Sequence, residues 1–109
     1  MALTTNTVSQ TGGIANHAVG SIVTDSATAA AATINVGFVP RVVRFHNITD
    51  RISDVWYEGM AAASSIHTVA AGTVTLETTN GITVNADGTF TLTAVTMVAS
   101  KTFAWEAVG

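Results

Sequence analysis

Residues Val36–Arg51, which read VGFVPRVVRFHNITDR, are the stretch around which the rest of the chain is organised. The stretch holds the only proline of the chain, Pro40, and three of its four basic residues. Before the proline, apolar residues alternate with Thr, Asn and Gly, which is the period of a half-buried β-strand. Proline cannot donate a hydrogen bond within a sheet, so we expect Pro40 at an edge, a bulge or the start of a strand. The stretch therefore predicts a strand, a kink at Pro40, and a second strand that ends in the polar turn 47–51.

The second of these strands predicts a hairpin. Within 42–46, Val43 and Phe45 face one side and the polar residues face the other. Residues 53–60 alternate in the same way, and we expect them to pair with 42–46 across the turn 48–52. Strands so rich in Val and Phe are usually part of a core.

A second hairpin is predicted at Asp87-Gly88. A two-residue turn there would place the apolar residues of the two flanking strands on opposite faces of the sheet. A three-residue loop 86–88, with Gly88 in the left-handed conformation, instead places Val84 opposite Phe90 and gives the two strands one common apolar face. We therefore predict the three-residue loop.

The same argument applies to Asn80-Gly81. It predicts a loop at 79–81 with Leu76 opposite Val84, and so a three-stranded antiparallel meander over the C-terminal half. One face of that meander is expected to be apolar and the other rich in threonine.

The remaining segments complete an all-β pattern. Residues 14–24 are consistent with one strand, and 101–107 predict a last strand in which Phe103 and Trp105 share a face. The Ala-rich segment 25–32 is either a single helical turn or a loop, and 59–71 is predicted to be a long loop. Seven or eight short strands with Gly-based turns predict an all-β fold with negligible helix: a single-domain β-sandwich, jelly-roll-like or a small barrel.

Composition limits the partners. The chain has 109 residues, enough for one domain, and only 10% of them are charged. Its surface must then consist largely of small polar residues or be covered by other subunits. A net charge of −3 with few, scattered basic residues argues against a nucleic-acid surface. No apolar run approaches the roughly 20 residues of a membrane helix, so no membrane partner is expected.

The N-terminal segment Met1–Gly13 lacks a hydrophobic period and has no basic residue, so it does not resemble a signal peptide. We expect it to be an extended arm in front of a β domain at 14–109. Its polar residues Thr4, Thr5 and Asn6 are candidates for contact with a neighbouring subunit.

No residue pattern indicates catalysis or a cofactor. The histidines His17, His46 and His67 have no zinc-ligand spacing, and the chain has no cysteine. A nucleophile elbow, a phosphate loop and a dinucleotide fingerprint are all missing from the sequence. We therefore expect no metal site, no cofactor and no enzymatic activity.

Arg41, Arg44 and Arg51 supply most of the positive charge. Their simplest partners are acidic residues of the same chain, Asp50, Asp54 and Glu58. The alternative is that at least one arginine pairs across a subunit boundary, where its planar fork suits a carboxylate. These arginines, with the aromatic Trp56, are the candidate interface residues within the β domain.

A set of turn and strand motifs carries a resemblance to a known class of protein. The motifs lie between about Gly37 and Ala107: Phe38-x-Pro40-Arg41-x-Val43, Asn47-x-Thr49, Trp56-Tyr57-x-Gly59-Met60, Asn80-Gly81-Ile82-Thr83-Val84, Gly88-x-Phe90 and Trp105-Glu106-Ala107. The pattern resembles small virion structural proteins of tailed bacteriophages, capsid decoration (cement) proteins in particular.

The resemblance implies a protein that assembles in the host cytoplasm and binds the surface of the phage head. It implies the major capsid protein as partner, self-association as a homotrimer or another homo-oligomer, and stabilisation of the head by contacts that bridge subunits. Other proteins of similar pattern belong to tails or fibres, which leaves a carbohydrate-binding module as the alternative. Trp56, Tyr57 and Trp105 would then be the aromatic residues on which sugars could stack, unless they are buried in the core.

Overall fold

The computed structural model describes residues 16–109, and these residues form eight β-strands and no helix. The strands are β1 (His17–Val23), β2 (Ala32–Asn35), β3 (Val42–Asn47), β4 (Ile52–Tyr57), β5 (Ser64–Thr68), β6 (Val74–Val84), β7 (Thr89–Leu92) and β8 (Thr102–Val108). All pairings are antiparallel, in the order β1-β8-β3-β4-β5-β6-β7-β2. The all-β prediction is confirmed. The predicted arm, Met1–Gly13, lies outside the described residues.

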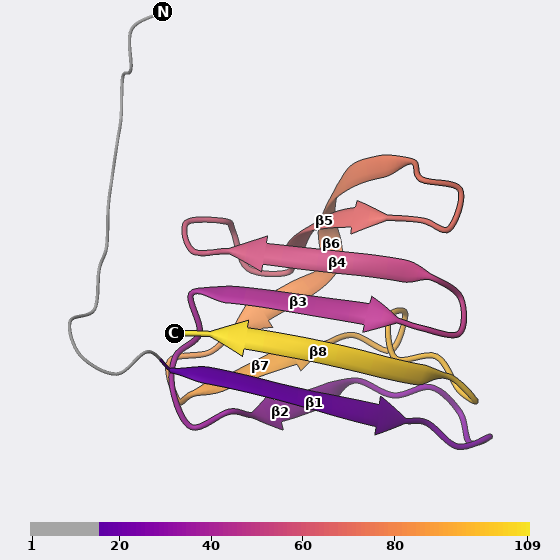
Figure 1. Cartoon of the computed structure of the whole chain (residues 1–109), viewed down its shortest axis with the longest axis horizontal. Helices are drawn as coiled ribbons and strands as arrows, with labels where there is room; N and C mark the ends of the chain where they lie inside the picture. Colours follow the sequence, from indigo (N-terminus) through magenta and orange to yellow (C-terminus); the bar gives the residue numbers. More distant parts are fainter. Residues whose placement is uncertain (1–15) are drawn as a thin grey trace, which may run out of the picture.

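The sheet curls into a half-barrel. In Figure 1 the strands β1, β8, β3, β4 and β5 form a front layer, and β7 and β2 lie behind it. Strand β6 belongs to both layers, because residues up to Ile82 pair with β5 and its last two residues, Thr83 and Val84, pair with β7. The sequence predicted a sandwich, a jelly-roll-like fold or a small barrel, and the observed form is one sheet folded over a core, with β1 and β2 as its two edges.

The core lies between the two layers. It is formed by buried apolar side chains that alternate with outward-facing residues along the strands: Val43, Phe45, Trp56, Ile82, Phe90, Leu92, Met97, Phe103 and Ala107. Phe45 and Phe103 stack within the front layer at a ring distance of 5.3 Å. Phe90 meets Trp105 edge to face at 5.4 Å and so joins the back layer to the front one. Burial of each Val, Ile, Leu, Phe or Met side chain in this core contributes about 1.5–3 kcal/mol relative to an exposed one.

The organising stretch spans both layers, as a strand, a kink and a strand. Strand β2 ends in the back layer, Gly37 follows with φ of 82°, and the chain passes the fully buried Pro40 before β3 begins. Strand β3 then lies in the front layer between β4 and β8. The predicted kink at Pro40 is therefore the crossing from one layer to the other.

Both predicted hairpins with apolar faces are confirmed. Strand β3 pairs with β4 so that Val43 lies opposite Trp56, on the buried face. Strand β6 pairs with β7 so that Val84 lies opposite Phe90. Gly88 adopts the left-handed conformation, with φ of 87°, as the three-residue loop requires.

The loop predicted at 79–81 is wrong, because β6 continues through Asn80 and Gly81. The extra residues form a bulge instead: Ser65 pairs with Glu77, whereas Ser64, the residue before it in β5, pairs with Ile82. The Glu77 carboxylate accepts hydrogen bonds from the backbone N–H groups of 78–80, at 3.1–3.2 Å. These contacts satisfy the backbone without a chain reversal.

Two segments that were predicted to be loops, or to be either a loop or a helical turn, are also defined by the structure. The long loop predicted at 59–71 contains β5, whose first residues Ser64 and Ser65 are buried. Alternating apolar residues did not reveal this strand because serine occupies its buried positions. The segment 25–31 is a loop without a helical turn. Among residues 16–109 there is no helix of the length and hydrophobicity that crossing a membrane requires.

Candidate interaction surface

The outer face of the front layer is a regular surface built from neighbouring strands. Strand pairing aligns one outward-facing residue from each of six strands in a single row: Val19, Glu106, Arg44, Val55, Ile66 and Leu76. Residues opposite each other in antiparallel strands share a face, so the register alone fixes this row.

One end of the row is apolar. Val55, Ile66, Val74 and Leu76, on β4, β5 and β6, form what we call the β4–β6 patch. Leu76 is 66% exposed and Val74 60% exposed, while Ile66 is 38% exposed. Single exposed apolar residues are common on proteins, whereas neighbouring ones on one sheet face form a continuous apolar patch.

The centre of the row is charged. The Glu106 carboxylate lies between the side chains of Arg44 and His17, with Arg44 Nη1 donating to Oε1 at 2.7 Å and His17 Nε2 lying 2.7 Å from Oε2. The hydrogen bonds from His17 and Arg44 lower the pKa of Glu106. Glu106 is therefore ionised at neutral pH, and it links the side chains of β1 and β3 across β8.

The three predicted arginines lie apart. Arg41 is at the start of β3, where its Nε lies 3.5 Å from Glu58 Oε2, and Arg51 is exposed in the turn at the other end of β3. Arg44 lies between them on the outer face. The pairing of Arg41 with Glu58 was one of the expected alternatives.

The partner of Arg44 was missed, because Glu106 is 62 residues away in the sequence. Only the pairing of β3 with β8, which no local pattern predicts, brings them together. The other predicted acidic partners are used elsewhere. Asp50 accepts from Lys101 at 3.1 Å, and Asp54 points inward.

The other candidate residues of the domain lie outside this row. Trp56 is 8% exposed and its indole N–H donates to the Ala61 carbonyl, so it belongs to the core rather than to an exposed surface. Trp105 packs against the core, while Tyr57 is 42% exposed. Thr4, Thr5 and Asn6 are outside the described residues.

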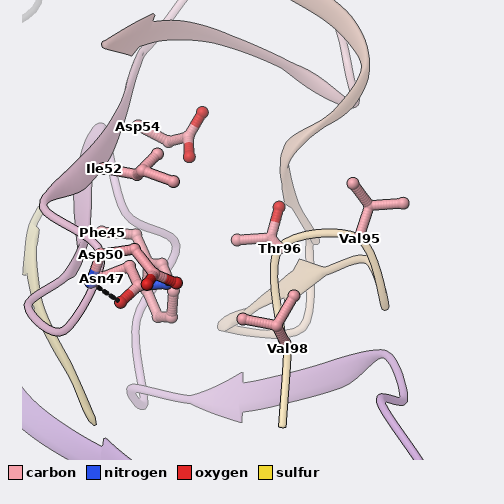
Figure 2. Close-up of a pocket in the computed structure, with 8 residues that line it drawn as sticks. All are labelled: Phe45, Asn47, Asp50, Ile52, Asp54, Val95, Thr96 and Val98. Carbon is pink, nitrogen blue, oxygen red and sulfur yellow. Dashed lines mark hydrogen bonds between the residues drawn. The ribbon is translucent and has the colours of Figure 1, made fainter. Parts of the chain in front are cut away.

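A small cavity lies inside the half-barrel, under β3 and β4 (Figure 2). Its volume is about 90 Å³. It is lined by apolar and acidic side chains from the front layer and from the segment after β7: Phe45, Asn47, Asp50, Ile52, Asp54, Val95, Thr96 and Val98. The space suits a few water molecules rather than a sugar or a nucleotide.

Asp54 holds a polar network beside this cavity. Its Oδ1 atom accepts from Ser65 Oγ at 2.7 Å and lies 2.9 Å from His67 Nδ1. In a hydrolytic triad the histidine stands between the serine and the carboxylate, whereas here the carboxylate stands between the other two. Ser65 is also fully buried. The network therefore has the geometry of a structural link between β4 and β5.

Among residues 16–109 no group of three or more His, Asp or Glu side chains is arranged to hold a metal ion. In comparisons with protein-family models, curated proteins and solved structures, no match to the chain was found.

Proposed function

We propose that the protein is a structural component of a phage virion that binds the assembled head and stabilises it through contacts with neighbouring capsid subunits. The resemblance of its turn and strand motifs to decoration proteins supports this proposal. The chain is also poor in charge and presents a broad, regular sheet face. The partner would be the major capsid protein, and binding to the assembled shell would stabilise that shell by mass action.

The observation that carries the proposal is the exposed β4–β6 patch. In water its apolar side chains are unfavourable, at roughly 25 cal/mol for each Å² that a partner would cover. The patch is continuous because the pairings of β4, β5 and β6 set its residues side by side. A rigid sheet loses little conformational entropy when it binds, which suits a protein that attaches to a preformed shell.

The charged centre of the row would give this surface its orientation. Arg44 and Glu106 are each more than a third exposed, so both can exchange part of their mutual pairing for groups on a partner. Charged groups of this kind contribute more to specificity and register than to affinity.

The proposal is tested with heads purified from a phage that lacks the gene. The full chain should sediment with these heads and raise the temperature at which they release DNA. Leu76→Glu should weaken this binding at least about tenfold, because it places a charge in the patch. The control is Ala86→Glu, which adds the same charge at an exposed loop residue of the β6–β7 hairpin. Equal binding by both variants, or no binding by the unchanged chain, contradicts the proposal.

A specific observation favours a second candidate, a carbohydrate-binding module of a tail or fibre. Tyr57 is exposed at the end of β4, beside Arg41 and Glu58 in an open depression. An aromatic face next to charged hydrogen-bonding groups is typical of sugar recognition. Binding of the full chain to an immobilised glycan panel, lost in Tyr57→Ala and kept in Leu76→Glu, would favour this function over head binding.

A further inference from the structure

The β1 edge of the sheet is unpaired within the described residues, since β1 pairs only with β8. Two hydrogen bonds flank the β1–β8 ladder and fix its pattern. Gly109 N–H donates to Asn16 O at one end, and Thr24 N–H donates to Lys101 O at the other. The even-numbered residues of β1 therefore direct their backbone groups toward β8. The odd-numbered residues, His17, Val19, Ser21 and Val23, direct theirs to the open edge.

Within residues 16–109, this edge has none of the features that usually protect an edge strand from pairing with another chain. Strand β1 reads HAVGSIV and contains no proline, lysine or acidic residue, and it has seven residues. Val19 is 67% exposed and Val23 is 76% exposed. A long edge with free backbone groups and apolar side chains is a template for another strand.

The other edge is a poorer template. Strand β2 has four residues and its even-numbered residues bond to β7, as the hydrogen bond from Val36 N–H to Gly88 O indicates. Only Thr33 and Asn35 then face outward. A head-to-tail ring that joins β1 to β2 of the next copy would thus use only half of the outward-directed residues of β1.

We propose that a second copy of this chain pairs with the first along β1, antiparallel, about a two-fold axis that passes Gly20. This register sets Val19 opposite Ser21 of the second copy, and His17 opposite its Val23. It is the register in which the two seven-residue strands overlap completely, and it places outward-directed backbone groups of one strand against those of the other. Two front layers then become one continuous sheet.

The side chains fit this arrangement. Like charges do not meet, because β1 carries no lysine, arginine or carboxylate, and His17 is already held by Glu106. The exposed Val19 side chains of the two copies lie diagonally across the axis, within reach of each other. The pairing concerns contact between copies, and it does not depend on binding to a phage head.

The first test is the mass of the full chain in solution, measured by analytical ultracentrifugation. We expect a dimer. Ser21→Pro should raise the dissociation constant at least about tenfold, because it removes an outward N–H while leaving the bonds to β8 intact. Ser21→Ala should remain dimeric. Circular dichroism and the melting temperature identify any variant that fails to fold.

A matched pair of surface variants distinguishes pairing at the β1 edge from nonspecific association through exposed apolar residues. Val19→Lys and Leu76→Lys remove side chains of nearly equal exposure, 67% and 66%. Only Val19 lies on the β1 edge, so only Val19→Lys should dissociate the dimer. If both variants dissociate the dimer, or only Leu76→Lys does, the interface lies elsewhere on the face and the proposal fails.

The second test fixes the register by disulfide formation. The chain has no cysteine, so any engineered thiol is the only one. A mixture of Val19→Cys and Ser21→Cys chains should form the mixed disulfide, because directly opposite Cα atoms about 5.5 Å apart suit the bond. Either variant alone should cross-link poorly, since its own partner lies diagonally.

Other results overturn the proposal. A monomeric full chain that dimerises only after removal of residues 1–15 means that the chain covers its own edge. A trimer or larger ring means that β1 pairs with β2. Efficient cross-linking of Ser21→Cys with itself places the axis at Ser21 rather than at Gly20. A dimer in solution that fails to bind heads leaves this inference standing and contradicts only the proposed function.

Discussion

The indole ring of Trp105 lies over the backbone of Gly20, in the place where any larger side chain at residue 20 would point. The two residues are directly opposite in the β1–β8 pairing. A Cβ atom on Gly20 would lie 2.5 Å from Cε2 of Trp105. Because Trp105 also packs against Phe90, one aromatic side chain fastens the edge strand β1 to both layers of the half-barrel.

Gly20→Ala should therefore destabilise the domain, by about 1–3 kcal/mol, because the indole must move away from a well-packed position. Ser21→Ala, one residue away on the exposed face, should change the stability little. Urea unfolding followed by tryptophan fluorescence measures both. An unchanged midpoint for Gly20→Ala would show that the indole has room to shift.

Gly88 makes a prediction about the β6–β7 hairpin. Its φ of 87° is unfavourable for a β-branched residue, so Gly88→Val should cost at least about 1–2 kcal/mol. Gly88→Asn should cost less, because asparagine tolerates the left-handed conformation. Both variants introduce a Cβ near the backbone of Phe38, so their difference in melting temperature isolates the conformational term. Equal melting temperatures would contradict the three-residue loop.

Asp54 should be important for stability because it is the shared acceptor of Ser65 and His67. Asp54→Ala leaves two donors without their partner and should cost about 1–3 kcal/mol. Asp54→Asn keeps an acceptor oxygen of the same size and should cost less. Thermal unfolding of both variants tests which is the more stable. If the Asn variant is the less stable of the two, the network does not depend on an acceptor oxygen at residue 54.

Glu77 gives the bulge of β6 a dependence on pH. Hydrogen bonds from the backbone N–H groups of Thr79, Asn80 and Thr78 lower its pKa below the ordinary value of 4.5. A carboxyl group with a lowered pKa in the folded state stabilises the fold above its ordinary pKa, and this contribution is lost as the pH falls through the lowered pKa. Glu77→Gln should thus be less stable than the unchanged chain at pH 7, and the difference should shrink below pH 4.5.

The melting temperatures of the two chains, measured from pH 7 to pH 3 or so, check this dependence. Glu106 also has a lowered pKa, but it is present in both chains and cancels in the difference. A gap that stays constant with pH would mean that the amide replaces the carboxylate fully.

The alternation of apolar and polar residues predicted much of this fold. It failed where the hydrogen bonds of the backbone could not be inferred from the local sequence. The alternation around Val43 and Phe45 placed β3 correctly, because one face of that strand is buried and the other is more exposed. Asn80-Gly81 was misread as a turn because the sequence cannot show that Glu77 satisfies the backbone there. Gly81 is required for a different reason, since a Cβ on it would collide with the backbone of Ser64.

The candidate surface was predictable only in part. The sequence identified Arg44 as an outward-facing cation of the central strand, which is where it lies. Its neighbours in the row come from strands far apart in sequence, and strand order is not encoded in any short segment. The apolar patch on β4–β6 was hidden for the same reason, because Leu76 was expected to face a core with Val84 rather than solvent beside Ile66.

Strand β6 passes from the front layer into the back layer without an intervening loop, so we expect the two layers to unfold together. Its eleven residues carry hydrogen bonds to β5 at one end and to β7 at the other, with no loop between them to act as a hinge. Opening the back layer would break the pairing of β6 with β7 and expose the core that both layers share. We therefore expect no stable state in which only one of the two layers is folded.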